Sequence, residues 1–152
     1  MTIVKNTRNR IFALALAASL IVATALAQDT VAHDGSGVNL SADSYLVDAA
    51  GMALYLYAPD AQGASTCYDE CAVAWPPFTV ASADALPAAG AGVDAALFGT
   101  TERDDGTLQL TYNGWPLYYF ASDVEAGSAG GQGLGGNWFT VSALGDAIGV
   151  EE

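Results

Sequence analysis

Basic residues are scarce in this chain of 152 residues, which has four lysines and arginines against 17 aspartates and glutamates. Lys5, Arg8 and Arg10 lie at the N-terminus, so Arg103 is the only cation in the rest of the chain. Residues 28–152 therefore carry a formal charge of 1 − 17 = −16. Nucleic acids and anionic lipids are bound through lysine and arginine. The composition excludes both as partners and favours cations, basic partners or simple solubility.

Histidine and lysine are too scarce for most catalytic machinery. The only histidine is His33, so neither a Ser-His-acid triad nor a histidine zinc cluster is expected. The chain has no lysine after Lys5, which removes Schiff-base chemistry. Carboxylates are abundant enough for a two-acid glycosidase, but no pair stands out. We predict that the protein is not an enzyme, and a small hydrolase is the least favoured alternative.

The one long apolar run lies near the N-terminus. It begins at Ile11 (IFALALAASLIVATALA), follows the basic residues and ends in the small-x-small sequence Ala25-Leu26-Ala27. This arrangement is typical of a cleavable secretory signal, and a run of about 17 residues is at the lower limit for a membrane span. We predict that residues 1–27 are a signal peptide and that the protein is periplasmic or secreted. Because no cysteine stands at the cleavage point, where a lipoprotein signal requires one, no stable membrane anchor is expected.

Removal of the signal leaves 152 − 27 = 125 residues, which is the size of one domain. Residues 28–43 are polar and contain Gly and Ser, so we expect a flexible leader. The domain is predicted to span residues 44–142, and residues 143–152 are expected to form a loose tail. Within the domain, residues 81–97 are rich in Ala and Gly and predict a long loop.

The domain contains an internal repeat with an offset of 63 positions. The segment Tyr45 to Asp60 (YLVDAAGMALYLYAPD) aligns with Leu108 to Asp123 (LQLTYNGWPLYYFASD), giving repeat units 45–75 and 108–138. The same offset pairs Gly51 with Gly114, Leu54 with Leu117, Tyr55 with Tyr118, Tyr57 with Phe120, Asp60 with Asp123 and Trp75 with Trp138. Two copies are too few for a solenoid and indicate a duplicated supersecondary unit.

Each unit is predicted to form a β-hairpin. Asn113-Gly114 separates two apolar, aromatic-rich runs, which is a strong hairpin signal because both residues tolerate positive φ. The first unit turns at Gly51. Further strands are expected at 98–102 and 137–143, with a turn at 104–106 between the first of these and 107–112. Residues 67–75 predict a short helical turn that ends at Pro76-Pro77.

Alternation along the two central strands predicts that both of their faces are covered. Tyr55, Tyr57, Tyr118 and Phe120 point to one side and leucines and Tyr119 to the other. We therefore predict a mostly β fold, a small sandwich or barrel-like domain built from two related hairpins, with a helical turn near the cysteines. The alternative for the aromatic residues is a ligand groove or an electron relay. Asp60 and Asp123 follow their strands and are expected to cap turns.

These residues resemble the bacterial family of "secreted repeat of unknown function", also described as predicted lipoproteins with a Yx(FWY)xxD motif. The motif occurs as Tyr55-x-Tyr57-x-x-Asp60 and again as Tyr118-x-Phe120-x-x-Asp123. The resemblance covers residues 44–142 and implies no established activity. Many relatives carry a lipoprotein cysteine, which this chain lacks.

Three further signatures carry the same resemblance. The CxxxC-AxxWPP pattern resembles Cys67 to Pro77, with Cys67, Cys71 and Trp75 at its defining positions. The pattern R-x-DG-x-x-Q-x-TY-x-G-x-PLYYF resembles Arg103 to Phe120, and a closing G-x-G-x-x-x-x-W resembles Gly131 to Trp138.

Cys67 and Cys71 are the only cysteines, and an exported protein meets an oxidising environment. A spacing of four on a helical turn places the Cα atoms about 6 Å apart, which permits a disulfide. The alternative is a thiolate pair for Cu(I), because soft sulfur selects that ion. Met52 is a candidate third ligand.

Three other features have a structural and a functional interpretation. Arg103 is either a surface charge or a structural ion pair with Asp60 or Asp123. Gly131 to Gly136 contains G-x-G-x-x-G, but it precedes an apparent strand rather than a helix, so a nucleotide site is not expected. Calcium could use Asp104-Asp105 or Asp69-Glu70, although EF-hand spacing is absent from the sequence.

We therefore predict an exported, non-enzymatic binding or interaction module without a cofactor. The alternative is a periplasmic electron-transfer or copper-handling accessory protein.

Overall fold

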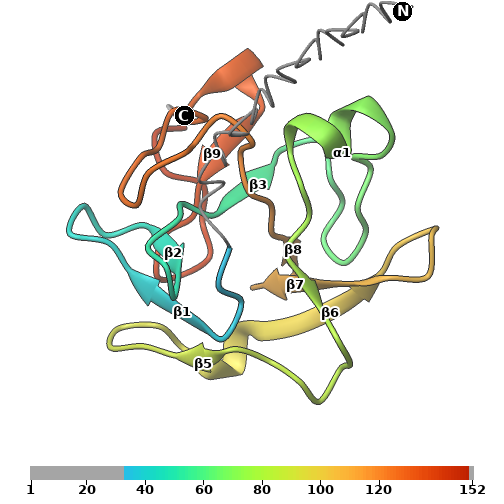
Figure 1. Cartoon of the computed structure of the whole chain (residues 1–152), viewed down its shortest axis with the longest axis horizontal. Helices are drawn as coiled ribbons and strands as arrows, with labels where there is room; N and C mark the ends of the chain where they lie inside the picture. The colour runs from blue at the N-terminus through green and yellow to red at the C-terminus, as the bar shows by residue number, and fades with distance from the viewer. Residues whose placement is uncertain (1–32, 151–152) are drawn as a thin grey trace, which may run out of the picture.

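A computed structural model describes residues 33–150, and the predicted signal peptide 1–27 lies outside the described residues. Three small sheets form the domain (Figure 1). The first has the order β2-β1-β5, the second pairs β3 with β9, and the third has the order β4-β7-β6 with β8 also paired to β7. The strands are β1 (Gly37–Leu40), β2 (Leu46–Asp48), β3 (Tyr55–Tyr57), β4 (Thr79–Val80), β5 (Ala88–Ala89), β6 (Phe98–Glu102), β7 (Leu108–Tyr112), β8 (Trp115–Pro116) and β9 (Trp138–Thr140).

Within residues 33–150, helical structure is limited to short segments. The α-helix α1 (Glu70–Ala74) contains Cys71 and ends just before Trp75-Pro76, within the range where the sequence predicts a helical turn. Two 3-10 turns, η1 (Ala95–Leu97) and η2 (Leu134–Gly136), complete the list of elements. The prediction of a mostly β domain with a short helical turn near the cysteines is confirmed.

The predicted hairpin of the second repeat forms around Asn113-Gly114. Both residues have positive φ, 49° and 82°, and Thr111 pairs with Pro116 across the turn. In the first repeat, Val47 forms a bridge with Ala53. Both turns reverse the chain, the second through the backbone freedom of Asn-Gly and the first through Gly51. The first turn is one residue longer, because Ala53, the equivalent of Pro116, pairs with Val47 and not with Asp48, the equivalent of Thr111.

The two repeats meet at equivalent residues. Tyr55 and Tyr118 form an antiparallel bridge in which each backbone N–H donates to the other residue's carbonyl at 2.9 Å. An antiparallel contact between equivalent positions relates the repeats by an approximate two-fold axis, as in an isologous dimer. The two hairpins consequently share one centre.

Two apolar clusters lie on opposite sides of these central segments. One contains Leu54, Leu56, Leu117 and Tyr119, and the other contains Tyr55, Tyr118, Trp75 and Trp138. Alternate residues of an extended chain face opposite sides, so the period-two pattern produces both clusters. The prediction that both faces are covered is therefore correct.

The structure differs from the predicted boundaries at both ends of the domain. Residues 37–40, placed in a flexible leader by the sequence, form β1 between β2 and β5, and Val38 is fully buried. At the other end, Ala147 forms a bridge with Val141 and packs against the leucine cluster, within the range predicted as a loose tail. Residues 28–43 are polar overall, and the sequence did not show that 37–40 pair with two other strands.

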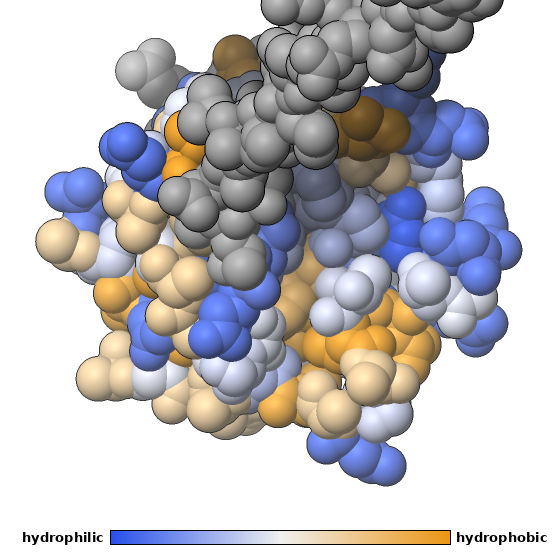
Figure 2. Space-filling model, in the orientation of Figure 1, coloured by the Kyte–Doolittle hydropathy of each residue, from blue (hydrophilic) through white to orange (hydrophobic). Residues whose placement is uncertain are grey.

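On the face shown in Figure 2, hydrophilic residues lie around much of the rim and an apolar patch lies over β6. Within residues 33–150, no helix has the length and apolar character needed to cross a bilayer.

Candidate functional site

The repeat motif forms two crossed hydrogen bonds at the centre of the domain. The Tyr55 hydroxyl donates to Asp123 Oδ2 at 2.5 Å, and the Tyr118 hydroxyl donates to Asp60 Oδ2 at 2.6 Å. Each tyrosine therefore binds the aspartate of the other repeat rather than its own. All four residues are buried.

The second oxygen of each aspartate holds a neighbouring loop. Asp60 Oδ1 accepts hydrogen bonds from the backbone N–H of Thr66 at 2.8 Å and from its hydroxyl at 2.6 Å. Asp123 Oδ1 accepts one from the backbone N–H of Gly130 at 2.9 Å. The aspartates thus fix loops, as expected of turn-capping residues, and in addition join the two repeats.

Burial shapes the acid–base properties of the two central tyrosines. Desolvation raises the pKa of Tyr55 well above its ordinary value, and the hydrogen bond to Asp123 raises it further. The pKa of Tyr118 is raised for the same reasons, with Asp60 as the acceptor. Both hydroxyls are therefore fixed proton donors over the ordinary pH range.

A stack of four aromatic rings lies beside the crossed pairs. Trp75 and Trp138 stack face to face, with centroids 3.8 Å apart and an interplanar angle of 2°. Tyr57 extends the stack from Trp138 at 4.3 Å, and Phe120 extends it from Trp75 at 4.4 Å. The order Tyr57–Trp138–Trp75–Phe120 alternates between the repeats and follows the two-fold relationship. We call these four residues the aromatic stack.

The central tyrosines, Tyr55 and Tyr118, make edge-to-face contacts with the aromatic stack. Tyr55 meets Trp75 at 5.3 Å and 79°, and Tyr118 meets Trp138 at 5.2 Å and 90°. Edge-to-face contacts of this kind are favoured by the charge distribution of aromatic rings. The offset of 63 in the sequence is therefore visible as matched contacts in the structure.

The glycine-rich segment packs against the aromatic stack. A Cβ placed on Gly131 would lie 2.6 Å from Trp75 Cη2 and 2.9 Å from Tyr55 Cε1, so only glycine fits at this point. The segment continues into η2, a turn of three residues, and then into β9. It lacks the strand-loop-helix context of a nucleotide site.

The two ends of the aromatic stack reach the surface. Trp75 and Trp138 are each 7% exposed, whereas Tyr57 and Phe120 are half-buried. Three aliphatic side chains, in segments that lie next to Trp75, Phe120 and Gly131 in the sequence, are strongly exposed: Val73 (74%), Val124 (60%) and Leu134 (42%). We call these three residues the exposed aliphatic set.

Cys67 and Cys71 form a disulfide with a Cα–Cα distance of 5.3 Å, and no described cysteine is free. The copper alternative requires two thiolates, and both sulfurs are bonded to each other. Within residues 33–150, no three histidine, cysteine or acidic side chains gather as a metal site would require. Asp105 instead accepts hydrogen bonds from Thr107 inside its own turn.

Arg103 lies in the interior. It is neither a surface charge nor part of an ion pair with Asp60 or Asp123, the two alternatives that the sequence suggested, because its hydrogen bonds go to neutral groups. The residue is 3% exposed, and its guanidinium donates to Ser65 Oγ, Gln109 Oε1 and the Cys67 carbonyl at 2.7–2.8 Å. It also lies over the Tyr68 ring at 4.4 Å. Asp60 and Asp123 are occupied by tyrosines, which explains why they do not pair with Arg103.

The contacts of Arg103 connect to the crossed pairs through a residue that sequence reasoning missed. Ser65 Oγ lies 2.6 Å from the Tyr118 hydroxyl, so Arg103, Ser65, Tyr118 and Asp60 form one continuous chain of hydrogen bonds. No pattern singles out Ser65. Gln109 could have been identified as a site residue from the sequence, because the family pattern beginning at Arg103 contains a glutamine at that position.

A small surface pocket is lined in part by Pro76 and Pro77, which follow Trp75 in the sequence. Its lining includes His33, Phe78 and Tyr119, and its volume of about 190 Å³ is below the range of typical ligand sites. His33 stacks on Tyr119 at 3.7 Å, and burial lowers its pKa. The pocket contains none of the repeat-motif residues.

Fold and site together define a small β-rich domain of two fused, symmetry-related repeats, joined by crossed Tyr–Asp pairs. The family described as "secreted repeat of unknown function" matches residues 41–79 and 99–142, more than half of the chain. The protein belongs to this family. No curated protein matches the chain. No solved structure matches it either.

Proposed function

We propose that the protein is an exported, non-enzymatic interaction module that binds a basic protein partner. The observation that supports this proposal is the exposed aliphatic set beside the half-buried ends of the aromatic stack. Exposed apolar patches with polar rims mark protein interaction surfaces. Residues 1–27 provide the route of export.

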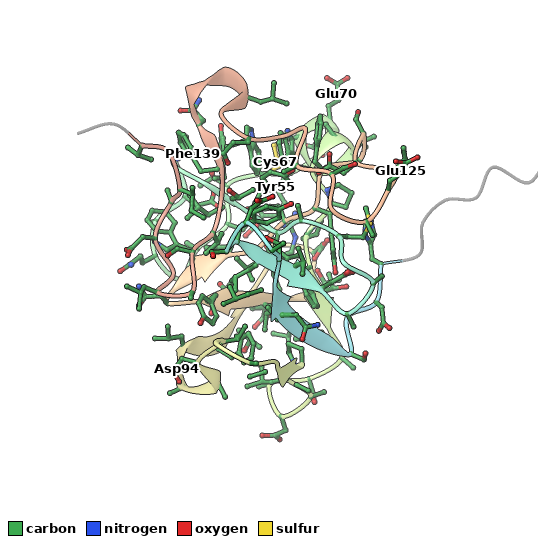
Figure 3. All side chains as sticks on the ribbon, turned by 90° about the vertical axis from the view of Figure 1, so that its left-hand side faces the viewer. Tyr55, Cys67, Glu70, Asp94, Glu125 and Phe139 are labelled. Atoms are coloured by element: carbon green, nitrogen blue, oxygen red, sulfur yellow. A yellow bond between two sulfur atoms is a disulfide. The ribbon has the colours of Figure 1, made fainter. Side chains whose placement is uncertain are left out.

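The exposed aliphatic set comes from three segments that gather at one end of the domain. Val73 lies on α1, and the Ala74 carbonyl accepts a hydrogen bond of 2.9 Å from Ala121, the start of the loop that carries Val124. Leu134 begins η2, just beyond the glycine that packs on Trp75. Figures 1 and 3 both place α1 and η2 at the same end of the molecule.

Charge specifies the kind of partner. Asp69, Glu70 and Glu125 are exposed next to the exposed aliphatic set, and Figure 3 shows Glu70 and Glu125 projecting away from the body of the domain. An apolar surface rimmed by carboxylates complements an apolar surface rimmed by lysine or arginine. The acidic rim also repels nucleic acid and anionic lipid.

Site-specific photo-crosslinking tests this proposal in the exported fraction of the native host. A benzophenone residue replaces Val73 or Val124, and a control replaces Leu144, which is 72% exposed but lies in the last turn of the domain. We expect one discrete adduct from positions 73 and 124 that weakens as salt increases, and none from 144. Equal labelling at all three positions, or none at 73 and 124, contradicts the proposal.

The aromatic stack favours electron transfer as a second candidate function. Four rings in face-to-face contact link two half-buried ends, and the acidic surface stabilises a positive charge on the indoles. A flash-generated ruthenium(III) complex would accept one electron from the stack and leave an indole radical cation. We expect Trp75→Phe and Trp138→Phe to reduce the radical yield severalfold, whereas Trp115→Phe, outside the stack, leaves it unchanged. Equal effects of all three variants exclude a relay.

A further inference from the structure

The two cysteines of the disulfide differ in their exposure to solvent. Cys67 is 1% exposed and belongs to the buried aromatic cluster, whereas Cys71 is half-buried on α1, the helix that also carries the exposed Val73. An incoming thiolate needs a path to the sulfur that it attacks. Of the two cysteines, Cys71 is the one whose residue is partly exposed.

The buried sulfur lies near the only cation of the domain. The Arg103 guanidinium donates to the Cys67 carbonyl at 2.7 Å, and covalent geometry keeps that oxygen within about 5 Å of the Sγ of the same residue. A thiolate on Cys67 would therefore form within about 8 Å of a guanidinium nitrogen, and a nearby arginine stabilises a thiolate.

Arg103 lacks a full set of partners. Its Nε is buried and has no hydrogen-bond partner within the described residues, and the other contacts of the guanidinium are to neutral oxygens and a tyrosine ring. A buried cation without a carboxylate is unfavourable, and an unsatisfied buried donor calls for an explanation. A thiolate at Cys67 would supply the missing negative charge.

The backbone inside the disulfide ring is strained. Asp69 has φ 50° and ψ −124°, which is outside the left-handed well that a non-glycine residue can occupy. Sparsely populated conformations persist only where the surrounding structure enforces them, and they concentrate at functional sites. The bond between Cys67 and Cys71 closes the ring around Asp69 and helps to enforce this conformation.

We propose that the Cys67–Cys71 disulfide is a thiol–disulfide exchange site that oxidises a dithiol. One thiolate of the dithiol attacks Cys71 Sγ, the S–S bond breaks, and Cys67 leaves as a thiolate beside Arg103. The second thiol of the dithiol, as its thiolate, then attacks the mixed disulfide and releases Cys71. The dithiol leaves as a disulfide, having lost two electrons and two protons, and the cysteine pair has gained them.

The first test uses the native full-length mature protein without denaturant. It is reacted with excess glutathione, quenched in acid at early times, and the adduct is located by mass spectrometry. We expect the initial adduct on Cys71. An initial adduct on Cys67, or reduction that occurs only after unfolding in urea, overturns the proposal. The probes are small thiols, so the result does not depend on the proposed protein partner.

The second test addresses Arg103 with a pair of variants. Arg103→Gln is expected to slow reduction by dithiothreitol about tenfold, and Arg103→Lys, which keeps the charge, less than that. Circular dichroism checks that both variants are folded. If Arg103→Gln does not fold, the location of the adduct in the native protein decides the question alone. A folded Arg103→Gln with an unchanged rate overturns the role of Arg103.

A parallel arm identifies the source of the dithiol. Dithiothreitol is compared with a peptide that contains a reduced Cys-x-x-Cys pair at equal concentration. Faster reaction of the peptide indicates a protein dithiol, and faster reaction of dithiothreitol indicates a low-mass thiol. No reaction with either overturns the proposal.

Discussion

Tyr55 and Asp123 come from different repeats, yet they form a buried hydrogen bond of 2.5 Å. Their counterparts Tyr118 and Asp60 form the reciprocal bond at 2.6 Å. The motif therefore joins the repeats rather than stabilising each one separately. The Oδ2 atom of each buried aspartate takes its donor from the other repeat, so the two units are expected to fold as a single cooperative domain.

Removing either tyrosine hydroxyl should destabilise the whole domain. Tyr55→Phe and Tyr118→Phe each leave a buried aspartate without one donor, which costs about 1–3 kcal/mol of unfolding free energy. Tyr57→Phe is the matched control, since that hydroxyl makes no hydrogen bond to any of the described residues and Tyr57 is half-buried. Urea unfolding measures all three, and a loss for Tyr57→Phe equal to the other two contradicts this assignment.

Alkaline pH should weaken the fold through the same tyrosines. Their pKa values in the folded protein lie above the ordinary value of 10.0, because burial and a carboxylate acceptor disfavour the phenolate. The stability that they contribute is complete below pH 10 and is lost as pH rises above it. Unfolding free energies measured from pH 8 to 12 should fall above about pH 10, and less steeply in Tyr55→Phe. A flat profile contradicts the prediction.

Gly131 should tolerate no side chain. A Cβ there would lie 2.6 Å from Trp75, so Gly131→Ala is expected to cost about 1–3 kcal/mol by overpacking. Gly133→Ala in the same loop meets no atom within 4 Å and has φ +73°, so it should cost only about 1 kcal/mol. Thermal unfolding with near-ultraviolet circular dichroism would show the altered tryptophan packing of Gly131→Ala alone.

Replacing Arg103 with methionine should be strongly destabilising. The variant removes the donors to Ser65, Gln109 and the Cys67 carbonyl, each of which lies in or near the interior. The loss is expected to exceed about 2 kcal/mol, which lowers the melting temperature by several degrees. Arg103→Lys retains the charge and is the control. A melting temperature unchanged by methionine would show that these contacts contribute nothing to stability.

Local features of the fold were recoverable from the sequence. Asn113-Gly114 predicts its own turn because both residues accept positive φ, and the alternation of Leu54, Tyr55 and Leu56 predicts two covered faces. The predicted strand at 98–102 matches β6. The cysteine spacing permitted a disulfide, and the structure contains one. Each of these properties depends on residues that are close together along the chain.

The sequence by itself determined that two equivalent units exist, since an offset of 63 pairs Tyr55 with Tyr118 and Asp60 with Asp123. Only the tertiary structure decided that each tyrosine binds the other repeat's aspartate, 68 and 58 positions away. It also decided that Arg103 is buried against neutral oxygens and that β1 joins the domain. The equivalence of the two units can be read from the order of residue types along the chain. Which aspartate each tyrosine binds depends on how distant segments pack around the shared two-fold axis.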